Sequence, residues 1–116
     1  MTRGEIWWAD FEIPFGSEPG FKRPILVVQD DAFNRSNIAT IVVLPLSTNL
    51  LLAQAPGNVF FKKGKTGLPK DSVLVTSHIH SIDRARLSDR IGKIAESAFE
   101  EVEEGLLLVL GIQGFR

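Results

Sequence analysis

An arginine at the start of an apolar run is the residue of this sequence best suited to holding a phosphate. Arg23 precedes Pro24 and the run 25–29. A guanidinium offers a planar fork of donors that matches a phosphate. A strand entered through a proline would fix where that fork points. The alternative is a structural ion pair between Arg23 and Glu18 or Asp30, and the residue types alone leave both interpretations open.

A second polar group follows another apolar run. The run 39–46 is succeeded by Ser47, Thr48 and Asn49. The two hydroxyls can donate hydrogen bonds to phosphate oxygens. The same residue types also favour turns, because their short side chains bond to the neighbouring backbone. A turn alone would explain them.

The two histidines, His78 and His80, are two residues apart. On a strand such residues share a face, so both rings could meet one ligand. A metal site would need a third ligand, for which Asp83 is the nearest candidate. A half-exposed polar face is the commoner origin of such a pair, and we predict no metal site.

The composition excludes several classes of protein. The 116 residues include no cysteine, which rules out disulfides, thiolate metal sites and a cysteine nucleophile. The motifs of dinucleotide-binding proteins, zinc proteases and serine hydrolases do not occur. The longest apolar runs, 41–46 and 106–112, are far shorter than the ~20 residues of a membrane span. The first residues show no apolar signal segment. We expect a single cytoplasmic domain, residues 1–116.

Short strands must position these candidate residues. Aromatic and β-branched runs predict strands at 5–11, 25–29, 39–46, 58–61, 72–77 and 90–94. Helical turns are expected within 30–36 and 82–87, and the basic, Gly- and Pro-containing segment 62–70 is expected to be a loop. Several short strands and one helix predict a mainly β (α+β) fold, a small curved sheet that closes towards a barrel.

The C-terminal segment predicts a helix. The apolar residues that recur at helical spacing are Phe99, Val102, Leu106, Val109 and Leu110. Ser97 and Glu100 have the spacing of a capping box. Gly111 or Gly114 can end the helix.

The charges are unevenly distributed, although the net charge is only −1. Five of the 14 acidic residues follow Lys93, where Arg116 is the single basic residue. The preceding part of the chain therefore has a balance of +3. This distribution leaves room for a local nucleic-acid surface, although ordinary solvated charge would explain it too.

Segments along nearly the whole chain resemble the MazF/PemK toxins. The matching segments are Arg3-Gly-Glu-Ile-Trp-Trp-Ala-Asp-Phe11, Gly16-Ser-Glu18, Arg23-Pro-Ile-Leu-Val-Val28, Phe33-Asn-Arg35, Val43-Leu-Pro-Leu-Ser-Thr-Asn49, Asp71-Ser-Val-Leu-Val75 and Ile82-Asp-Arg-Ala-Arg-Leu87. Each segment is a weak signal, but together, in order and at the length of the family, they are specific. The sequence departs from the family in segment 16–22, where Pro19 and Phe21 replace the usual Gln and Gly. It also lacks basic side chains that the family often has near His80.

The resemblance implies an SH3-like barrel of five to seven strands with a C-terminal helix, usually a homodimer. It implies a metal-independent endoribonuclease that needs no cofactor, cuts single-stranded RNA at short sequences and is neutralised by an acidic, MazE-like antitoxin. The two main catalytic positions of the family fall on Arg23 and Ser47. The family more often has Thr at the second position, and Ser keeps the hydroxyl.

The chemistry of these residues agrees with that activity. RNA can be cut without a metal when its own 2′-hydroxyl attacks the phosphorus, which leaves 2′,3′-cyclic phosphate and 5′-hydroxyl ends. Arg23 would stabilise the charge that develops on the phosphate, and Ser47 would orient the reacting groups by a hydrogen bond. Glu18, His78 and His80 are candidates for the group that accepts the 2′ proton.

Further residues are candidates for RNA binding. Lys22 and the loop 62–70 would contact phosphates, and Phe15, Phe21 and one tryptophan, Trp7 or Trp8, would stack on bases. The other tryptophan is expected in the core, because adjacent strand residues face opposite ways. The remaining RNA-binding candidates are Glu18, Thr48, Asn49, His78 and His80.

An alternative function is a non-enzymatic toxin of the same barrel fold that binds and inhibits DNA gyrase. Arg23 and Ser47 argue against this alternative, because such a binder has no use for a phosphate-holding pair at two strand ends.

Overall fold

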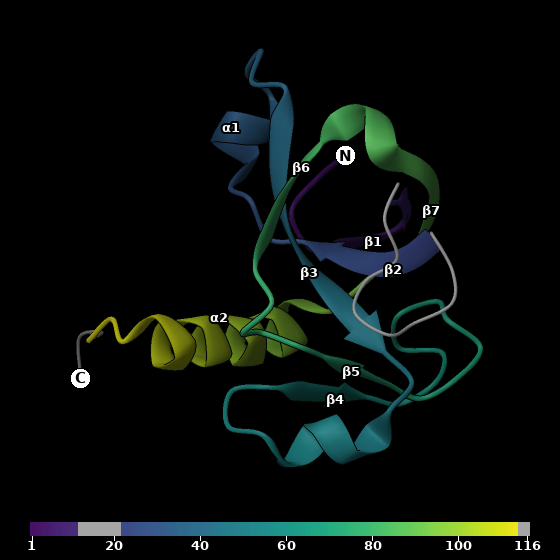
Figure 1. The fold of residues 1–116 in the computed structure, drawn as a ribbon, viewed down its shortest axis with the longest axis vertical. Helices are drawn as coiled ribbons and strands as arrows, with labels where there is room; N and C mark the ends of the chain where they lie inside the picture. The colour runs from purple at the N-terminus through teal and green to yellow at the C-terminus, as the bar shows by residue number, and fades with distance from the viewer. Residues whose placement is uncertain (12–21, 114–116) are drawn as a thin grey trace.

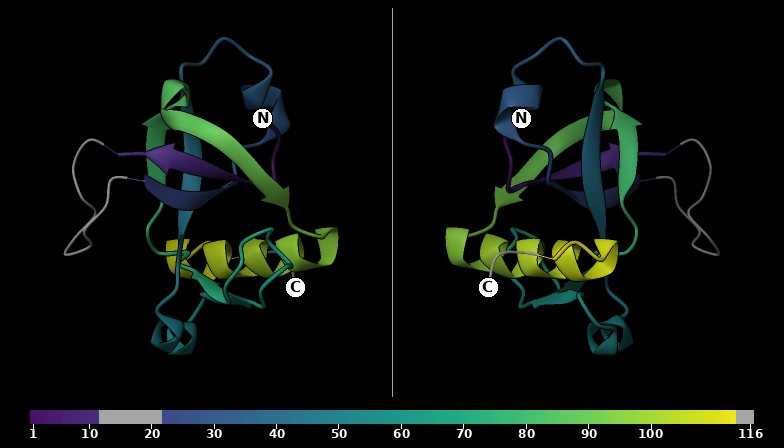
Figure 2. Two further views of the ribbon diagram at one scale, coloured as in Figure 1. Left: turned by 90° about the vertical axis from the view of Figure 1, so that its right-hand side faces the viewer. Right: turned by 90° about the vertical axis from the view of Figure 1, so that its left-hand side faces the viewer.

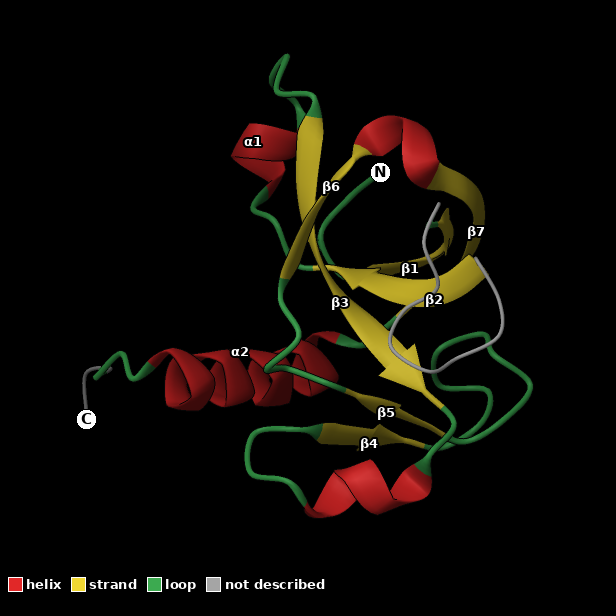
Figure 3. Ribbon diagram, viewed as in Figure 1, coloured by secondary structure: helices red, strands yellow, loops and turns green. Residues whose placement is uncertain are grey.

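A computed structural model describes residues 1–11 and 22–113 (Figure 1). In this part of the chain, one sheet contains the strands β1 (Glu5–Asp10), β2 (Lys22–Val27), β3 (Thr40–Ser47), β4 (Val59–Phe61), β5 (Ser72–Leu74), β6 (His80–Asp83) and β7 (Leu87–Lys93). The helices are α1 (Asp31–Asn34), α2 (Glu96–Leu110) and the 3-10 helices η1 (Leu50–Gln54) and η2 (Arg84–Arg86). Figure 3 shows the short helices at the periphery of the sheet and α2 beside the strands. No helix among the described residues is long and apolar enough to cross a membrane.

The long strand β3 makes the sheet curl. The sheet order is β4-β5-β3-β2-β1-β7, and β6 is an additional partner of β3. The first half of β3 pairs with β6, whereas its end pairs with β5, so that Ser47 lies opposite Val73. One strand therefore joins two differently directed parts of the sheet (Figure 2). The expected mainly β fold, a curved sheet with a C-terminal helix, is confirmed.

Alternate residues of β2 and β3 face two separate apolar clusters. The first cluster joins Leu26 and Leu44 to Phe99 and Val102 of α2. The members of the second cluster, on the other face, are Ala9, Ile25, Val27, Ile41, Val43 and Ile82. Because the sheet is covered on both faces, these strands are continuous apolar runs rather than alternating ones.

Helix α2 is confirmed in its body and its end, but the predicted capping box is wrong. The N-cap is Ala95, which has no capping side chain, and Ser97 lies inside the first turn. The helix ends at Gly111, whose φ of 68° is the left-handed conformation that glycine adopts at low cost. Only the first half of the apolar stripe is buried, and Leu110 is 54% exposed. Figure 1 shows the C-terminal half of α2 projecting away from the sheet.

Two glycines bring α2 close to the turn before β4. A Cβ atom on Gly105 would collide with the carbonyl oxygen of Gly57 and lie 3.1 Å from Cγ2 of Thr76. This contact explains why a glycine stands in the middle of a helix, where it costs ~1 kcal/mol relative to alanine.

Segment 80–94 agrees with the prediction in part. The helical turn predicted within 82–87 is confirmed as the 3-10 helix η2, and the strand predicted at 90–94 overlaps β7, which begins earlier, at Leu87, whereas β6 was not predicted. Strand β6 has only four residues, too few to produce a clear alternating pattern. The carboxylate of Asp83 ends the strand, because it accepts a hydrogen bond from the backbone of Ala85 and caps η2.

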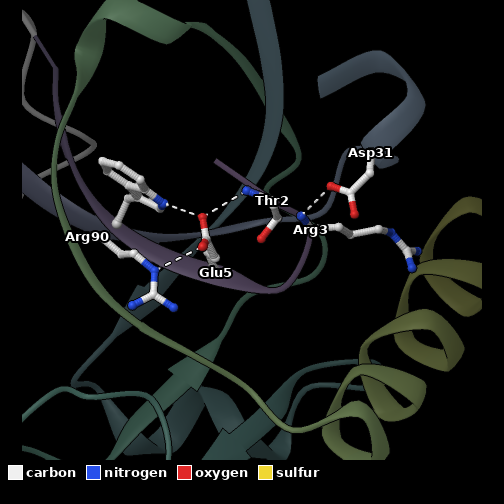
Figure 4. A network of polar contacts seen from close by, with 6 residues as sticks. Thr2, Arg3, Glu5, Asp31 and Arg90 are labelled. Carbon is white, nitrogen blue, oxygen red and sulfur yellow. Dashed lines mark hydrogen bonds and ion pairs between the residues drawn. The ribbon is translucent and has the colours of Figure 1, made fainter. Parts of the chain in front are cut away.

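Hydrogen bonds to the carboxylate of Glu5 hold the N-terminal segment in place (Figure 4). Glu5 accepts hydrogen bonds from the backbone N–H of Thr2 at 2.8 Å, from Nε1 of Trp7 at 3.1 Å and from Nε of Arg90 at 2.9 Å. Burial alone raises the pKa of Glu5, but these hydrogen bonds outweigh it and hold the pKa at about 2. The network therefore stabilises the contact between β1 and β7 while Glu5 is ionised.

Candidate active site

Strand pairing brings Arg23 and Ser47 to one end of the sheet. Strands β2 and β3 are antiparallel, with Ile25 opposite Pro45. The same register, continued by two residues, places Arg23 opposite Ser47. Both residues, together with Thr48, line one pocket of about 300 Å³. The structure thus brings together the two predicted catalytic residues from separate parts of the sequence.

The pocket combines apolar walls with positive charge. Its apolar lining residues are Trp8, Pro24, Leu46, Leu68 and Pro69. Two exposed lysines, Lys22 and Lys70, also line it, as does the buried Ser72. Arg23 itself is only 8% exposed. A buried guanidinium flanked by lysines favours a negatively charged ligand.

Larger hollows lie along α2 but have the wrong charge for RNA. One of about 550 Å³ is lined by Arg3, three glutamates and two leucines, and another, of about 530 Å³, includes Glu104. Carboxylates repel phosphates, so the smaller pocket beside Arg23 is the candidate site.

Ser47 is the last residue of β3, and its side chain bonds to the turn that follows, yet its hydroxyl remains able to donate a hydrogen bond. Its Oγ accepts a hydrogen bond from the backbone N–H of Asn49 at 3.1 Å. That bond uses a lone pair, so the hydroxyl proton can still be donated to a substrate. The side chain of Asn49 has a structural role, because it accepts a hydrogen bond from the N–H of Leu51 and caps η1. Asn49 is not among the residues that line the pocket.

The two histidines are placed differently from each other. His80 begins β6, but His78 precedes that strand, and its N–H bonds to the carbonyl of Val75. The expectation that both lie on one strand is therefore wrong. Burial lowers the pKa of His80, and electrostatic interactions with His78 and Arg23 lower it further. His80 is consequently neutral at pH 7 and close enough to Arg23 to respond to its charge.

The strand register explains why Arg23 influences His80. Val27 lies opposite Val43 in one strand pair, and Val43 lies opposite His80 in the next. These three side chains share one face, which Arg23, four residues before Val27, shares as well. The half-buried ring of Phe11 meets the ring of His80 edge-on, with centroids 6.4 Å apart.

The third ligand considered for a metal site is elsewhere. Asp83 is three residues after His80 on the same strand, which turns it to the opposite face. Within residues 1–11 and 22–113, no group of three His, Asp or Glu side chains is positioned to hold a metal ion.

Two carboxylates were considered as ion-pair partners of Arg23, and one of them, that of Asp30, has another role. Asp30 instead accepts a hydrogen bond from the N–H of Ala32 at 2.8 Å and caps α1. The other partner, Glu18, lies outside the described residues, as do Phe15 and Phe21.

Sequence reasoning missed part of the pocket. Leu68, Pro69 and Ser72 were not singled out, and Lys70 was considered only as part of a basic loop. Ser72 begins β5, and the other three belong to the segment that connects β4 to β5. No local pattern indicates that this segment folds back against Trp8. A basic residue at the end of a Gly- and Pro-containing loop was the available signal.

A curled sheet with a C-terminal helix and a basic pocket at the strand ends defines a small β protein suited to a phosphodiester ligand. Comparison with known sequences assigns the family. Residues 2–110 match the family described as PemK-like, MazF-like toxin of type II toxin–antitoxin system, and the chain belongs to this family.

Named relatives cover nearly the full chain. The sequence is 41% identical over 112 residues to endoribonuclease MazF2 of Mycobacterium bovis and to endoribonuclease MazF6 of Mycobacterium tuberculosis, which covers 97% of this chain and 98% of each relative. It is 33% identical over 115 residues to endoribonuclease EndoA of Bacillus subtilis, covering 99% of this chain and 98% of the relative.

Solved structures share the fold. An endoribonuclease in complex with its cognate antitoxin, from a mycobacterial species, superposes with a TM-score of 0.80 at 20% identity over 99% of both chains. MazF of Deinococcus radiodurans superposes with a TM-score of 0.74 at 24% identity over 97% of both chains.

Proposed function

We propose that this toxin is an endoribonuclease that cuts single-stranded RNA by attack of the 2′-hydroxyl, without a metal. The observation that carries the proposal is the meeting of Arg23 and Ser47 in one basic pocket. The names of the relatives support it, since they are endoribonucleases. The gyrase-binding alternative has no support from these relatives.

Arg23 has the role of stabilising negative charge that develops on the phosphate. Attack by the 2′-oxygen gives a phosphorane with extra charge on its equatorial oxygens, and a rigidly held guanidinium meets that charge with two parallel donors. Arg23 is not a base in this scheme, because a guanidinium stays protonated at every working pH. Ser47 orients the phosphate through its hydroxyl proton.

His80 is the described residue best suited to accept the 2′ proton. It is neutral at pH 7 because burial, His78 and Arg23 lower its pKa. A neutral imidazole can accept a proton and later return it. Its position on the same face of the sheet as Arg23 supports this assignment over the more exposed His78.

The partners follow from family membership and from the exposed apolar surface. We infer that residues 1–116 act as one cytoplasmic domain, that the toxin forms an isologous homodimer and that an acidic, MazE-like antitoxin inhibits it. Leu107, Leu108, Leu110 and Ile112 are all exposed near the C-terminal end of α2. A cluster of this kind on a small protein is typical of an interface with a partner chain.

Purified toxin incubated with single-stranded RNA in EDTA tests the activity. The expected result is a set of discrete fragments with 2′,3′-cyclic phosphate and 5′-hydroxyl ends, unchanged by chelation. Fragments with 5′-phosphate ends that disappear on chelation would contradict the proposal, because they indicate metal-activated water. Gyrase inhibition without RNA cleavage would favour the alternative function.

A further inference from the structure

The two adjacent tryptophans face different environments. Trp7 lies opposite Ile25, packs against the cluster that contains Ala9 and donates a hydrogen bond to Glu5. Trp8 lies opposite Pro24 on the other face, is half-buried and lines the pocket beside Arg23. Trp7 therefore has a structural role, whereas Trp8 presents part of its indole to a ligand.

The pocket around Trp8 has the form of a site for one flat ring. Its volume of about 300 Å³ is at the small end of the range of ligand sites. Leu46 and Leu68, 1% and 6% exposed, are buried beside it and supply apolar walls. A cavity of this size admits one base turned out of a single strand and excludes a stacked duplex. Bases of single-stranded RNA are bound in this manner by aromatic side chains.

The outer wall of the pocket is fixed before any ligand arrives. Gly67 lies so close to Ile91 of β7 that an added Cβ would be 2.7 Å from the Ile91 carbonyl oxygen. The adjacent Thr66 is 1% exposed, and its hydroxyl accepts a hydrogen bond from the N–H of Leu68 at 3.1 Å. These contacts hold Leu68 in position against the sheet, so little ordering of this wall remains to oppose binding.

The charges around the pocket match a nucleotide rather than an apolar side chain. Lys22 and Arg23 line it from β2, and Lys70 lines it from the segment before β5. A base inserted between these groups carries a phosphate on each side, and the two lysines can meet those phosphates. An apolar side chain of a protein partner would offer no negative charge to either lysine.

We propose that this pocket is a nucleobase subsite, in which one base next to the cleaved bond stacks on Trp8 while Lys22 and Lys70 hold the flanking phosphates. The inference rests on the proposed ribonuclease function and assigns a substrate contact to it. Arg23 and Ser47 line the same pocket as Trp8, so the subsite contributes to the choice of cleavage position.

Tryptophan fluorescence tests the subsite directly. Trp7→Phe leaves Trp8 as the single tryptophan and leaves the pocket unchanged. The probe is a randomised 2′-O-methyl RNA octamer, which cannot be cut because the 2′-oxygen is blocked. The control probe is an octamer of abasic spacers with the same phosphates. We expect the RNA octamer to quench Trp8 emission and the spacer to bind about 5–150-fold more weakly, the equivalent of ~1–3 kcal/mol for one stacked base.

Substitution of Trp8 gives an independent measurement. Trp8→Phe keeps an aromatic face and should retain most of the affinity for the RNA octamer, whereas Trp8→Leu should lose about as much as the spacer does. Circular dichroism confirms that each variant is folded. If Trp8→Leu does not fold, the fluorescence of the Trp7→Phe protein still tests whether a base stacks on Trp8.

The outcomes separate the subsite from the ribonuclease function. The subsite proposal would be overturned if the protein bound RNA and spacer with equal affinity, or if RNA did not quench Trp8 emission. If the same protein still cut RNA, the proposed function would remain intact. Quenching by the RNA octamer in a protein that cuts no RNA would support the subsite and contradict the ribonuclease function.

Discussion

Arg23 and His80 lie on the same face of the sheet, on two strands, β2 and β6, that both pair with β3. The buried guanidinium is thus close enough to act on the proton affinity of the imidazole. One strand, β3, thus positions both the residue that we propose to hold the phosphate and the residue that we propose to accept the proton.

The first prediction concerns the pH dependence of cleavage. Burial, His78 and Arg23 place the pKa of His80 below its ordinary value of 6.5. If neutral His80 accepts the 2′ proton, kcat/KM falls as the pH drops through this lowered pKa, so the acidic limb lies below pH 6.5. His78→Gln removes the electrostatic interaction by which His78 lowers the pKa of His80, so it should raise that pKa and move the limb to higher pH. An acidic limb that persists in His80→Gln would exclude His80 as the base.

The second prediction concerns the transition state. Arg23→Ala should reduce kcat by about 10²–10³ and affect RNA affinity much less, because the charge it meets develops only during the reaction. Arg23→Lys should restore little, since an ammonium lacks the two-pronged geometry. Ser47→Thr should stay active and Ser47→Ala should not. Single-turnover kinetics with separate binding measurements check this, and a loss confined to KM would assign Arg23 to binding alone.

The third prediction distinguishes the lysines. Lys70→Ala and Lys22→Ala should each reduce the slope of log affinity against log salt by about 0.7, the value for one phosphate contact with a single strand. Lys65→Ala is the matched control, because Lys65 belongs to the same loop as Lys70 but does not line the pocket. Equal effects of Lys65→Ala and Lys70→Ala would indicate diffuse attraction by the loop rather than contacts at the pocket.

The fourth prediction concerns the packing of α2. In an isolated helix Gly→Ala is stabilising, but Gly105→Ala places a Cβ against the carbonyl oxygen of Gly57 and should destabilise the protein by about 1–3 kcal/mol. Ser97→Ala is the control and should change the free energy of unfolding by less than about 0.5 kcal/mol, because Ser97 does not cap the helix. Urea unfolding measures both. A stabilised Gly105→Ala protein would show that α2 does not approach the turn so closely.

The fifth prediction concerns acid stability. The pKa of Glu5 is about 2 in the folded protein and near 4.3 in an unfolded chain, so its ionised form stabilises the fold above that higher value. The contribution, about 1–3 kcal/mol, disappears as the pH falls from about 4.5 towards 2. Glu5→Gln should therefore be less stable at pH 7 and equal to the parent protein near pH 2. The exposed Glu101→Gln should show no such convergence.

The pairing of strands determined which features could be predicted. The runs that became β2 and β3 are buried on both faces, so their apolar character predicts them directly. Strand β6 was missed because Ile82 is its one buried residue, and a four-residue segment gives no period. The capping box at Ser97 failed because the N-cap is Ala95, two residues earlier than the motif needs.

The candidate site also combines features that the sequence predicts with features that it does not. Arg23 and Ser47 could be predicted because each ends an apolar run and fits a family pattern. The contribution of Trp8, Leu68 and Lys70 to one pocket could not, because it depends on how the segment between β4 and β5 folds across the sheet. The nearness of His80 to Arg23 likewise depends on two strands sharing β3, which no local pattern specifies.

The order of the strands also sets when this toxin can become harmful. Strand β1, near the N-terminus, lies between β2 and β7, and Arg3 is joined to Glu103 of α2 at 3.1 Å. The first strand is therefore without one of its neighbours until β7 has left the ribosome, and such distant pairings form late in folding. A chain truncated before β7 would lack the strand that completes β1, so incomplete translation products should be harmless to the RNA of the cell that makes them.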